Sequence, residues 1–258
     1  MAYDAVMRMR ATHQQKFRVR AYETDPHGRL EVPILCKLMQ ETAAAHATIL
    51  GVSVETLMDH GVAWVLSHLH LKVNRWPGSD AEITIKTWPE AANRLIIERH
   101  FEILDSAGDL AASASTYWVV LDLERRRPVR LPAVVLEAME QHEIGSATAK
   151  PDRLDGPDLV DQERVFTVRR SDLDLADHVN NTSYVEWAME AVPDDVWASQ
   201  ELAELQIGFL SECHQGQTIV SVSQTTGDAR GSEVRHQLVR RGDGEPVARA
   251  RTLWRSVG

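Results

Sequence analysis

"SDLDLADHVNNTSYVEWAME", residues 171–190, joins an acidic loop to an amphipathic segment without a break. The preceding "RVFTVRRS", residues 164–171, alternates apolar and polar residues, as a half-buried strand does. The asparagines that begin "NNTSYVEWAMEAV" can cap a helix, and Pro193 marks where that helix stops. We therefore expect a strand, a short loop and a helix in this part of the chain.

The same order occurs earlier in the sequence. "KFRVRAYE", residues 16–23, reads as a strand, and "VPILCKLMQETAAAHATIL", residues 32–50, reads as a helix with a proline in its first turn. Matches at an offset of 149 join the two regions: Phe17, Val19, Arg20, Asp25 and Glu41 recur as Phe166, Val168, Arg169, Asp174 and Glu190. The sequence therefore predicts an internal duplication.

Beyond the helices, the offset becomes 136. Leu69, Arg99, His100, Gly108, Ala112, Ala114, Thr116 and Trp118 recur as Leu205, Arg235, His236, Gly244, Ala248, Ala250, Thr252 and Trp254. Alternating segments predict strands near 62–76, 81–89, 94–105 and 110–122, and again near 203–211, 216–225, 233–241 and 246–255. A strand, one long helix and an antiparallel meander form an α+β unit, and the chain contains two of them.

Bulk composition excludes several classes of protein. A formal net charge of −10 argues against general binding to nucleic acid, which needs an excess of cationic side chains. Cys36 and Cys213 are too few for a disulfide framework and suit a reducing compartment. No apolar run approaches the ~20 residues of a membrane span, and "MAYDAVMRMRATHQQ" lacks the hydrophobic core of a signal peptide. We expect a cytoplasmic protein that binds neither nucleic acid nor membrane.

The repeated unit resembles the hot-dog fold, and several motifs resemble the acyl-acyl-carrier-protein thioesterases. These motifs are "SDLDLADHVNNTSYVEW" at 171–187, "FLSEC" at 209–213, "TWP" at 87–89 and "WVVLDLERRRPVRLP" at 118–132. The resemblance extends from Phe17 to Trp254 and implies a tandem double hot-dog. Residues 1–145 would form the first repeat and hold the acyl chain, 146–162 a linker, and 163–258 the second repeat with the catalytic residues. The implied activity is hydrolysis of the fatty acyl-carrier-protein thioester, which releases a free fatty acid and terminates chain elongation.

In this family, catalysis is attributed to an Asp-x-Asn-x-His run before the second helix and a Glu-Cys pair on a later strand. The resemblance therefore implies that Asp174, His178, Glu212 and Cys213 are catalytic. Ala176 departs from the pattern, because the family has asparagine there. The start of the helix, at Asn180 and Asn181, offers unpaired N–H groups to a thioester oxygen, so we expect these residues to bind substrate.

The duplication gives an independent view of these residues. At the fixed offsets, Asp174 matches Asp25, whereas the places of His178, Glu212 and Cys213 are taken in the first copy by Arg29, Trp76 and Pro77. A structural role would more naturally be shared by both copies, as the matches of Arg99 with Arg235 and of His100 with His236 suggest. The three unshared polar groups therefore favour a catalytic role.

Two mechanisms are open. His178 and Glu212 can activate a water molecule, or Cys213 can attack the thioester as a nucleophile paired with the histidine. Adjacent strand residues point to opposite faces, so Glu212 and Cys213 should not both face His178. We favour the activated water, because a buried cysteine is more often a small hydrophobe, as we also expect for Cys36 in the first helix.

Other features carry weaker predictions. His68 and His70 share a strand face but lack a third ligand at recognisable spacing, so we expect no metal. No phosphate-binding loop or Gly-x-Ser-x-Gly elbow occurs, and we expect no cofactor. The cationic stretch at 125–130 could dock an acidic carrier protein. An acyl-CoA thioesterase, a hot-dog dehydratase, a non-catalytic acyl-binding module and a homodimer remain alternatives to be tested.

Overall fold

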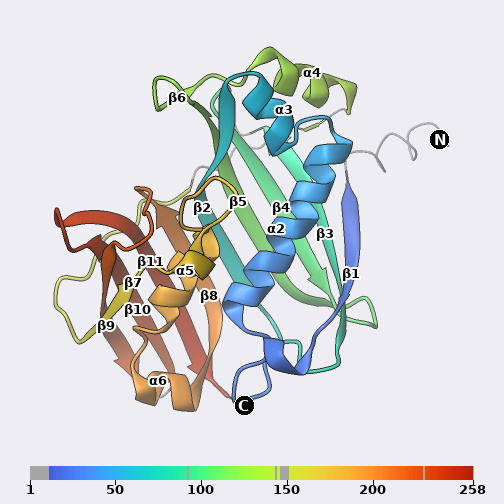
Figure 1. The fold of residues 1–258 in the computed structure, drawn as a ribbon. Coiled ribbons are helices and arrows are strands. Elements are labelled where there is room, and N and C mark those ends of the chain that lie inside the picture. The colour runs from blue at the N-terminus through green and yellow to red at the C-terminus, as the bar shows by residue number, and fades with distance from the viewer. Residues whose placement is uncertain (1–11, 92, 143, 146–150, 229, 258) are drawn as a thin grey trace. The chain divides into compact units, whose positions relative to one another are not determined.

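The computed structural model describes residues 12–91, 93–142, 144, 145, 151–228 and 230–257 (Figure 1). The chain divides into two compact units at Pro151 and Asp152, except that His68–Val73 belong to the second unit. Residues 1–11, which hold most of the N-terminal stretch considered above, and residues 146–150 of the expected linker lie outside the described residues. No described helix is long and apolar enough to span a bilayer.

The first unit is an antiparallel sheet with a long helix against it. Along the sheet the strands are β1 (His13–Arg18), β3 (Glu82–Ala91), β4 (Ile96–Leu104), β5 (Leu110–Asp122) and β2 (Val62–Val73), and β6 (Arg127–Val129) pairs with β5. Its helical elements are η1 (Ala21–Glu23), α2 (Val32–Ile49), α3 (Val54–Asp59) and α4 (Ala133–Gln141). The sequence did not lead us to predict α3, α4 or β6; α3 and β6 are too short to show a clear periodicity.

Helix α2 agrees with its prediction. Pro33 lies in the first turn, where a missing N–H breaks no helical hydrogen bond, and Gly51 just beyond the end adopts a positive φ of 73°. One face is buried at helical spacing and contacts β1 and β3, as Figure 1 shows for its course along the sheet. The buried side chains are Val32, Leu35, Cys36, Met39, Thr42, Ala43 and His46.

The second unit repeats this order. Its sheet runs β7 (Gln162–Thr167), β9 (Thr218–Asp228), β10 (Gly231–Arg240), β11 (Glu245–Ser256) and β8 (Gln200–Phe209), and β8 pairs with the last residues of β2. Its helical elements are η2 (Arg170–Asp172), α5 (Asn181–Met189) and the unpredicted α6 (Asp194–Ser199). Helix α5 contacts β9 and β10 and buries Trp187 almost completely. The structure therefore has the α+β hot-dog architecture that the sequence predicted.

Strand registers show the duplication in atomic detail. Phe17 pairs with Ile83 in the first unit, and Phe166 pairs with Ile219 in the second. The turn after each first strand is closed in the same way. The Arg20 backbone N–H donates to Glu23 at 2.8 Å, and the Arg169 backbone N–H donates to Asp172 at 2.7 Å; both acids are buried.

One equivalence drawn from the sequence is wrong. Thr116 donates to the carbonyl of Arg99, and Thr252 donates to the carbonyl of Val234, so Val234 and not Arg235 is the counterpart of Arg99. The reason is an extra residue in the second hairpin: Ile103 pairs with Ala112, nine positions on, whereas Leu238 pairs with Ala248, ten positions on. A shift of one residue moves every side chain to the opposite face.

The consequence is that the matched charged residues do not share an environment. Arg99 is buried, but Arg235 is on the partly exposed face of its sheet. His100 is partly exposed, whereas His236 is fully buried. These pairs are therefore not a structural feature that the two copies share. They give no support to the argument that His178, Glu212 and Cys213 are catalytic because the first copy lacks them.

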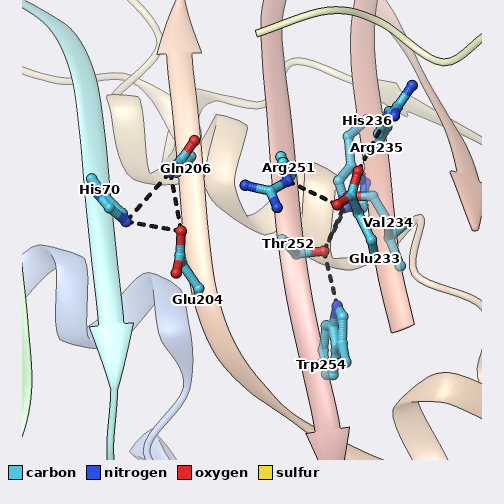
Figure 2. Close-up of polar contacts among 10 residues, drawn as sticks. All are labelled: His70, Glu204, Gln206, Glu233, Val234, Arg235, His236, Arg251, Thr252 and Trp254. Carbon is cyan, nitrogen blue, oxygen red and sulfur yellow. Dashed lines mark hydrogen bonds and ion pairs between the residues drawn. The ribbon is translucent and has the colours of Figure 1, made fainter. Parts of the chain in front are cut away.

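A polar network covers the face of the second sheet opposite to His236. Figure 2 shows Glu233 between two cations, with Glu233 Oε1 3.1 Å from Arg235 Nε and Glu233 Oε2 3.0 Å from Arg251 Nε. His70 Nε2 lies 3.0 Å from Glu204 Oε1 on the neighbouring β8, as the same view shows. These pairs satisfy the charged groups of a half-exposed sheet face.

The described part of the expected linker lies against this face. Arg249 Nη1 donates to the carbonyl of Leu154 at 3.4 Å, and Asp158 Oδ2 lies 3.5 Å from Arg235 Nη1. Further along, Asp161 accepts from the backbone N–H of Thr225 at 2.7 Å. Residues 154–161 therefore run across β11, β10 and β9 in turn, and they are attached to the second unit along this path.

Candidate active site

Asp174 folds the loop that carries His178. Its Oδ1 accepts from the backbone N–H of Ala176 at 2.8 Å and of His178 at 3.3 Å, the arrangement of an Asx turn. The backbone N–H of Asp174 also donates to the carbonyl of His178 at 2.8 Å. Asp177 takes a positive φ of 60° at the position where the first copy has Gly28, with a φ of 75°. These bonds fix the backbone from which the His178 side chain projects.

His178 faces Glu212. The distance from His178 Nε2 to Glu212 Oε2 is 3.5 Å, and the two side chains are 30% and 36% exposed. Water therefore reaches both groups. An imidazole beside a carboxylate can hold and move a proton, because the carboxylate stabilises the imidazolium that forms. The structure thus brings together two of the four residues implied to be catalytic.

The sequence placed Glu212 and Cys213 on a strand, but in the structure neither residue lies on one. Strand β8 ends at Phe209, so both residues lie in the loop that follows it. The loop is held from two sides: Val179 N–H donates to the carbonyl of Cys213 at 3.0 Å, and Arg240 Nη1 donates to the carbonyl of Glu212 at 2.8 Å. The first bond joins the Glu212 loop to the residue after His178.

Cys213 points away from solvent. Its side chain is fully buried, and burial raises the pKa of the thiol, although hydrogen bonding with Tyr184 and the nearby charge of Arg240 oppose this effect. A raised pKa disfavours the thiolate, which is the nucleophilic form. Cys36 is also buried, and burial raises its pKa to about 12, as fits a core residue of α2.

Asn180 and Asn181 lie where the helix begins. Asn180 is the N-cap of α5, and its Oδ1 accepts from the backbone N–H and the hydroxyl of Thr182 at 2.9 and 2.8 Å. Within the described residues, Asn180 Nδ2 and the backbone N–H of Asn181 have no hydrogen-bond acceptor. Both donors are therefore open to a ligand at the positive end of the helix.

His214 is a residue that the sequence reading missed. Its ring centroid lies 5.0 Å from that of His178, with an interplanar angle of 59°. His178, Glu212 and His214 each present a ligand atom, and these atoms all lie within 4.8 Å of one another. The adjacency of "ECH" at 212–214 was the available signal, but the third member is far away in sequence.

The two histidines considered for metal binding from sequence do not form such a group. Among the described residues, the only cluster of three or more potential ligand side chains is that of His178, Glu212 and His214. His70 pairs with Glu204 instead, as in Figure 2, and burial lowers the pKa of His68.

Comparisons with known proteins agree with the fold and the motifs. Residues 10–139 match the family model of the acyl-ACP thioesterase N-terminal domain, and residues 157–256 match that of the C-terminal domain. The hydrolase FATB2 of Cuphea viscosissima, an acyl-[acyl-carrier-protein] hydrolase named as chloroplastic, is 28% identical over 257 residues, or 94% of this chain and 62% of the relative. Oleoyl-acyl carrier protein thioesterase 1 of Arabidopsis thaliana is 26% identical over 276 residues, or 95% of this chain and 76% of the relative. The chain thus spans less than two thirds of the length of the first of these relatives.

Solved structures show the same architecture. The 12:0-ACP thioesterase from Umbellularia californica has a TM-score of 0.86 at 24% identity, covering 96% of this chain and 95% of that one. An acyl-ACP thioesterase from Bacteroides thetaiotaomicron has a TM-score of 0.83 at 21% identity, covering 96% and 99%. At these identities the likeness concerns the fold, whereas the two family models together span most of the sequence. The chain belongs to the acyl-ACP thioesterase family.

Proposed function

We propose that this protein hydrolyses the thioester of a fatty acyl-acyl-carrier protein and releases the free fatty acid. The observation that carries the proposal is the pair formed by His178 Nε2 and Glu212 Oε2, 3.5 Å apart and partly exposed. His178 lies two residues before Asn180, the N-cap of α5, and an acyl carbonyl at the start of this helix would gain hydrogen-bond donors. At the corresponding places the first unit has Arg29 and Trp76, which cannot act as this base.

In the proposed reaction, a water molecule attacks the thioester carbonyl carbon while His178, supported by Glu212, takes its proton. The carbonyl oxygen becomes an oxyanion and is stabilised by the Asn181 N–H and by Asn180 Nδ2. When the carbon–oxygen double bond re-forms, the carbon–sulfur bond breaks. The proton then passes from His178 to the departing thiolate, and the products are the fatty acid and the thiol of the carrier.

Asp174 and Cys213 complete the set proposed from the family resemblance. The bonds from Asp174 to the backbone of residues 176 and 178 support a positioning role, because they orient the loop that presents His178. The buried side chain of Cys213 supports the water mechanism over a covalent acyl-enzyme. The carbonyl of Cys213 still contributes by joining the two loops.

The division of labour between the repeats follows from the same proposal. Residues 1–145 would hold the acyl chain, 146–162 would link the repeats, and 163–258 would catalyse hydrolysis. An acidic carrier protein finds complementary charge on the exposed side chains of Arg125, Arg126, Arg127 and Arg130, around the turn between β5 and β6. The cytoplasmic location and the homodimer stay predictions.

The test is a hydrolysis assay with acyl-carrier-protein thioesters of several chain lengths, read by the fatty acid released. We expect hydrolysis by the wild type, a loss of ~10²-fold or more in His178→Ala, and no loss in His27→Ala, an exposed histidine in the corresponding loop of the first repeat. Faster turnover of the matching acyl-CoA would favour an acyl-CoA thioesterase, and dehydration of a hydroxyacyl thioester would favour a dehydratase. No turnover of any thioester would leave the acyl-binding module.

A further inference from the structure

The group formed by His178, Glu212 and His214 has the composition of a three-ligand metal site. Zn²⁺ in catalytic sites is commonly bound by two histidines and one carboxylate, with a fourth position left open. All three side chains are at least partly exposed, so an ion can reach them from solvent. The glutamate also supplies negative charge to attract a cation.

The distances are close to those that one ion requires. Two ligand atoms on a tetrahedral Zn²⁺, with bonds of about 2.0–2.1 Å, lie about 3.4 Å apart. His178 Nε2 and Glu212 Oε2 are already 3.5 Å apart. The remaining separations are within 4.8 Å, and a rotation of the exposed His214 side chain can shorten them.

The backbone that carries these ligands is fixed without metal. The His178 loop is closed by Asp174, and the Glu212 loop is held by Arg240. The bond from Val179 N–H to the carbonyl of Cys213 joins the loops between the ligand positions. Since little chain must be ordered when an ion arrives, most of its binding energy remains as affinity.

We propose that His178, Glu212 and His214 together bind one Zn²⁺ or a similar first-row divalent ion, and that the bound ion inhibits hydrolysis. The inhibitory part rests on the proposed function, because it assigns the base to His178 and Glu212. A metal takes the imidazole lone pair that must accept the proton of the attacking water, and it also takes the carboxylate that supports the histidine. Inhibition involves only the reversible binding of the ion, which releases a proton from any ligand that was protonated beforehand.

His214 separates this site from catalysis. The proposed reaction uses His178 and Glu212 but not His214, so His214→Ala should keep hydrolysis and lose the third ligand. His27→Ala, which removes an exposed histidine in the loop of the first repeat, is the matched control.

The experiment titrates the full chain, free of any histidine tag, with Co²⁺ and follows the d–d absorption of the bound ion, then displaces it with Zn²⁺. We expect one Co²⁺ per chain in the wild type and in His27→Ala, and an affinity lower by ~10-fold or more in His214→Ala and Glu212→Ala. Hydrolysis is then measured with and without Zn²⁺ through the released fatty acid, because the thiol product itself binds Zn²⁺. Zn²⁺ should slow hydrolysis by the wild type and by His27→Ala, and EDTA should restore their rates. Hydrolysis by His214→Ala should be little affected by Zn²⁺.

The two readouts distinguish the failures. Equal Co²⁺ affinity in the wild type and His214→Ala would overturn the site, even if hydrolysis proceeds as proposed. If Zn²⁺ inhibits the wild type and His214→Ala equally, or speeds hydrolysis, the proposed inhibitory role of the bound ion is overturned. If none of the proteins hydrolyses a thioester, the proposed function fails, while the Co²⁺ titration still decides whether the metal site exists.

Discussion

Asp174 and Asp25 hold their loops with the same pair of bonds. Asp25 Oδ1 accepts from the backbone N–H groups of His27 and Arg29, each at 2.9 Å, and Asp174 Oδ1 accepts from those of Ala176 and His178. The aspartate is therefore a shared element of the turn. What differs is the residue four positions on: Arg29 returns to its own aspartate at 3.0 Å, whereas His178 turns to Glu212.

This relationship predicts how Asp174 variants behave. Asp174→Asn keeps an oxygen that can accept both backbone bonds, so we expect it to retain hydrolysis within ~10-fold of the wild type. Asp174→Ala removes the acceptor, loosens the loop and should lower turnover by ~10²-fold. Steady-state rates with one acyl-carrier-protein substrate check this ranking. Equal and severe losses in both variants would mean that the charge itself takes part in the chemistry.

A second prediction separates the two mechanisms. Glu212→Ala should lower turnover by ~10²-fold or more, as His178→Ala should, because each change removes part of the proposed base. Cys213→Ala should leave substantial hydrolysis, with some loss of stability from the small cavity left in a buried site. Mass spectrometry of rapidly quenched reactions checks for an acyl group on the protein. A covalent acyl adduct on Cys213 would reverse the assignment.

A third prediction concerns Ala176, where the chain departs from the family pattern. Its side chain is exposed and its backbone N–H is already bound to Asp174, so an asparagine fits without displacing the turn. If an amide there positions water or the carbonyl, Ala176→Asn should raise the hydrolysis rate by ~10-fold, which corresponds to ~1.4 kcal/mol. Rates across several acyl-chain lengths measure the effect. A slower enzyme with an intact fold would mean that a neighbour, Asp177 or Asn180, already performs this task.

The buried histidine of the second sheet gives a prediction about stability and pH. Burial lowers the pKa of His236 from 6.5 to about 3, and its Nδ1 is buried with no hydrogen-bond partner among the described residues. Because the folded pKa lies below the unfolded one, the unfolded chain binds the extra proton between these values. The contribution to stability is therefore complete above pH 6.5 and is lost as the pH falls, by about 1 kcal/mol per pH unit.

Removing the titrating group should remove this dependence. His236→Leu replaces the imidazole with an apolar side chain of similar size. It removes the bond between His236 Nε2 and Thr252 Oγ1, but Thr252 still accepts a hydrogen bond from Trp254 Nε1 at 2.8 Å. Urea unfolding from pH about 7.5 to about 4.5 should show a smaller loss of the free energy of unfolding in the variant than in the wild type. His27→Leu, at an exposed site, is the control. Parallel curves for His236→Leu and the wild type would show that His236 does not titrate on unfolding.

The periodicity of the sequence and its internal repeat predicted most of the strands, the first long helix and the duplication. Among the described residues, alternation located every strand except β6, because a sheet with one buried face imposes a period of two on its sequence. The first strand of each unit ends earlier than predicted, at Arg18 and Thr167, and the predicted residues 21–23 and 170–171 lie in η1 and η2 instead. The helix over 32–50 was found from its apolar spacing and its proline. The duplication was visible because both copies need the same turn residues, such as Asp25 and Asp174, to make the same bonds. The unpredicted α3 and α6 have six residues each, which is too few turns to show a period.

Tertiary structure alone decided which side chains meet. His178 and Glu212 are brought together by the bond between Val179 and Cys213, and His214 joins them only because its loop leaves β8 at Phe209. The fold also decided which side of its sheet each of Arg99 and His236 faces. One extra residue in the second hairpin exchanges the two faces of the strand, although the residues still match at an offset of 136. Sequence records the local period of each element, but contacts between distant residues are set by strand register and loop length, which no local pattern specifies.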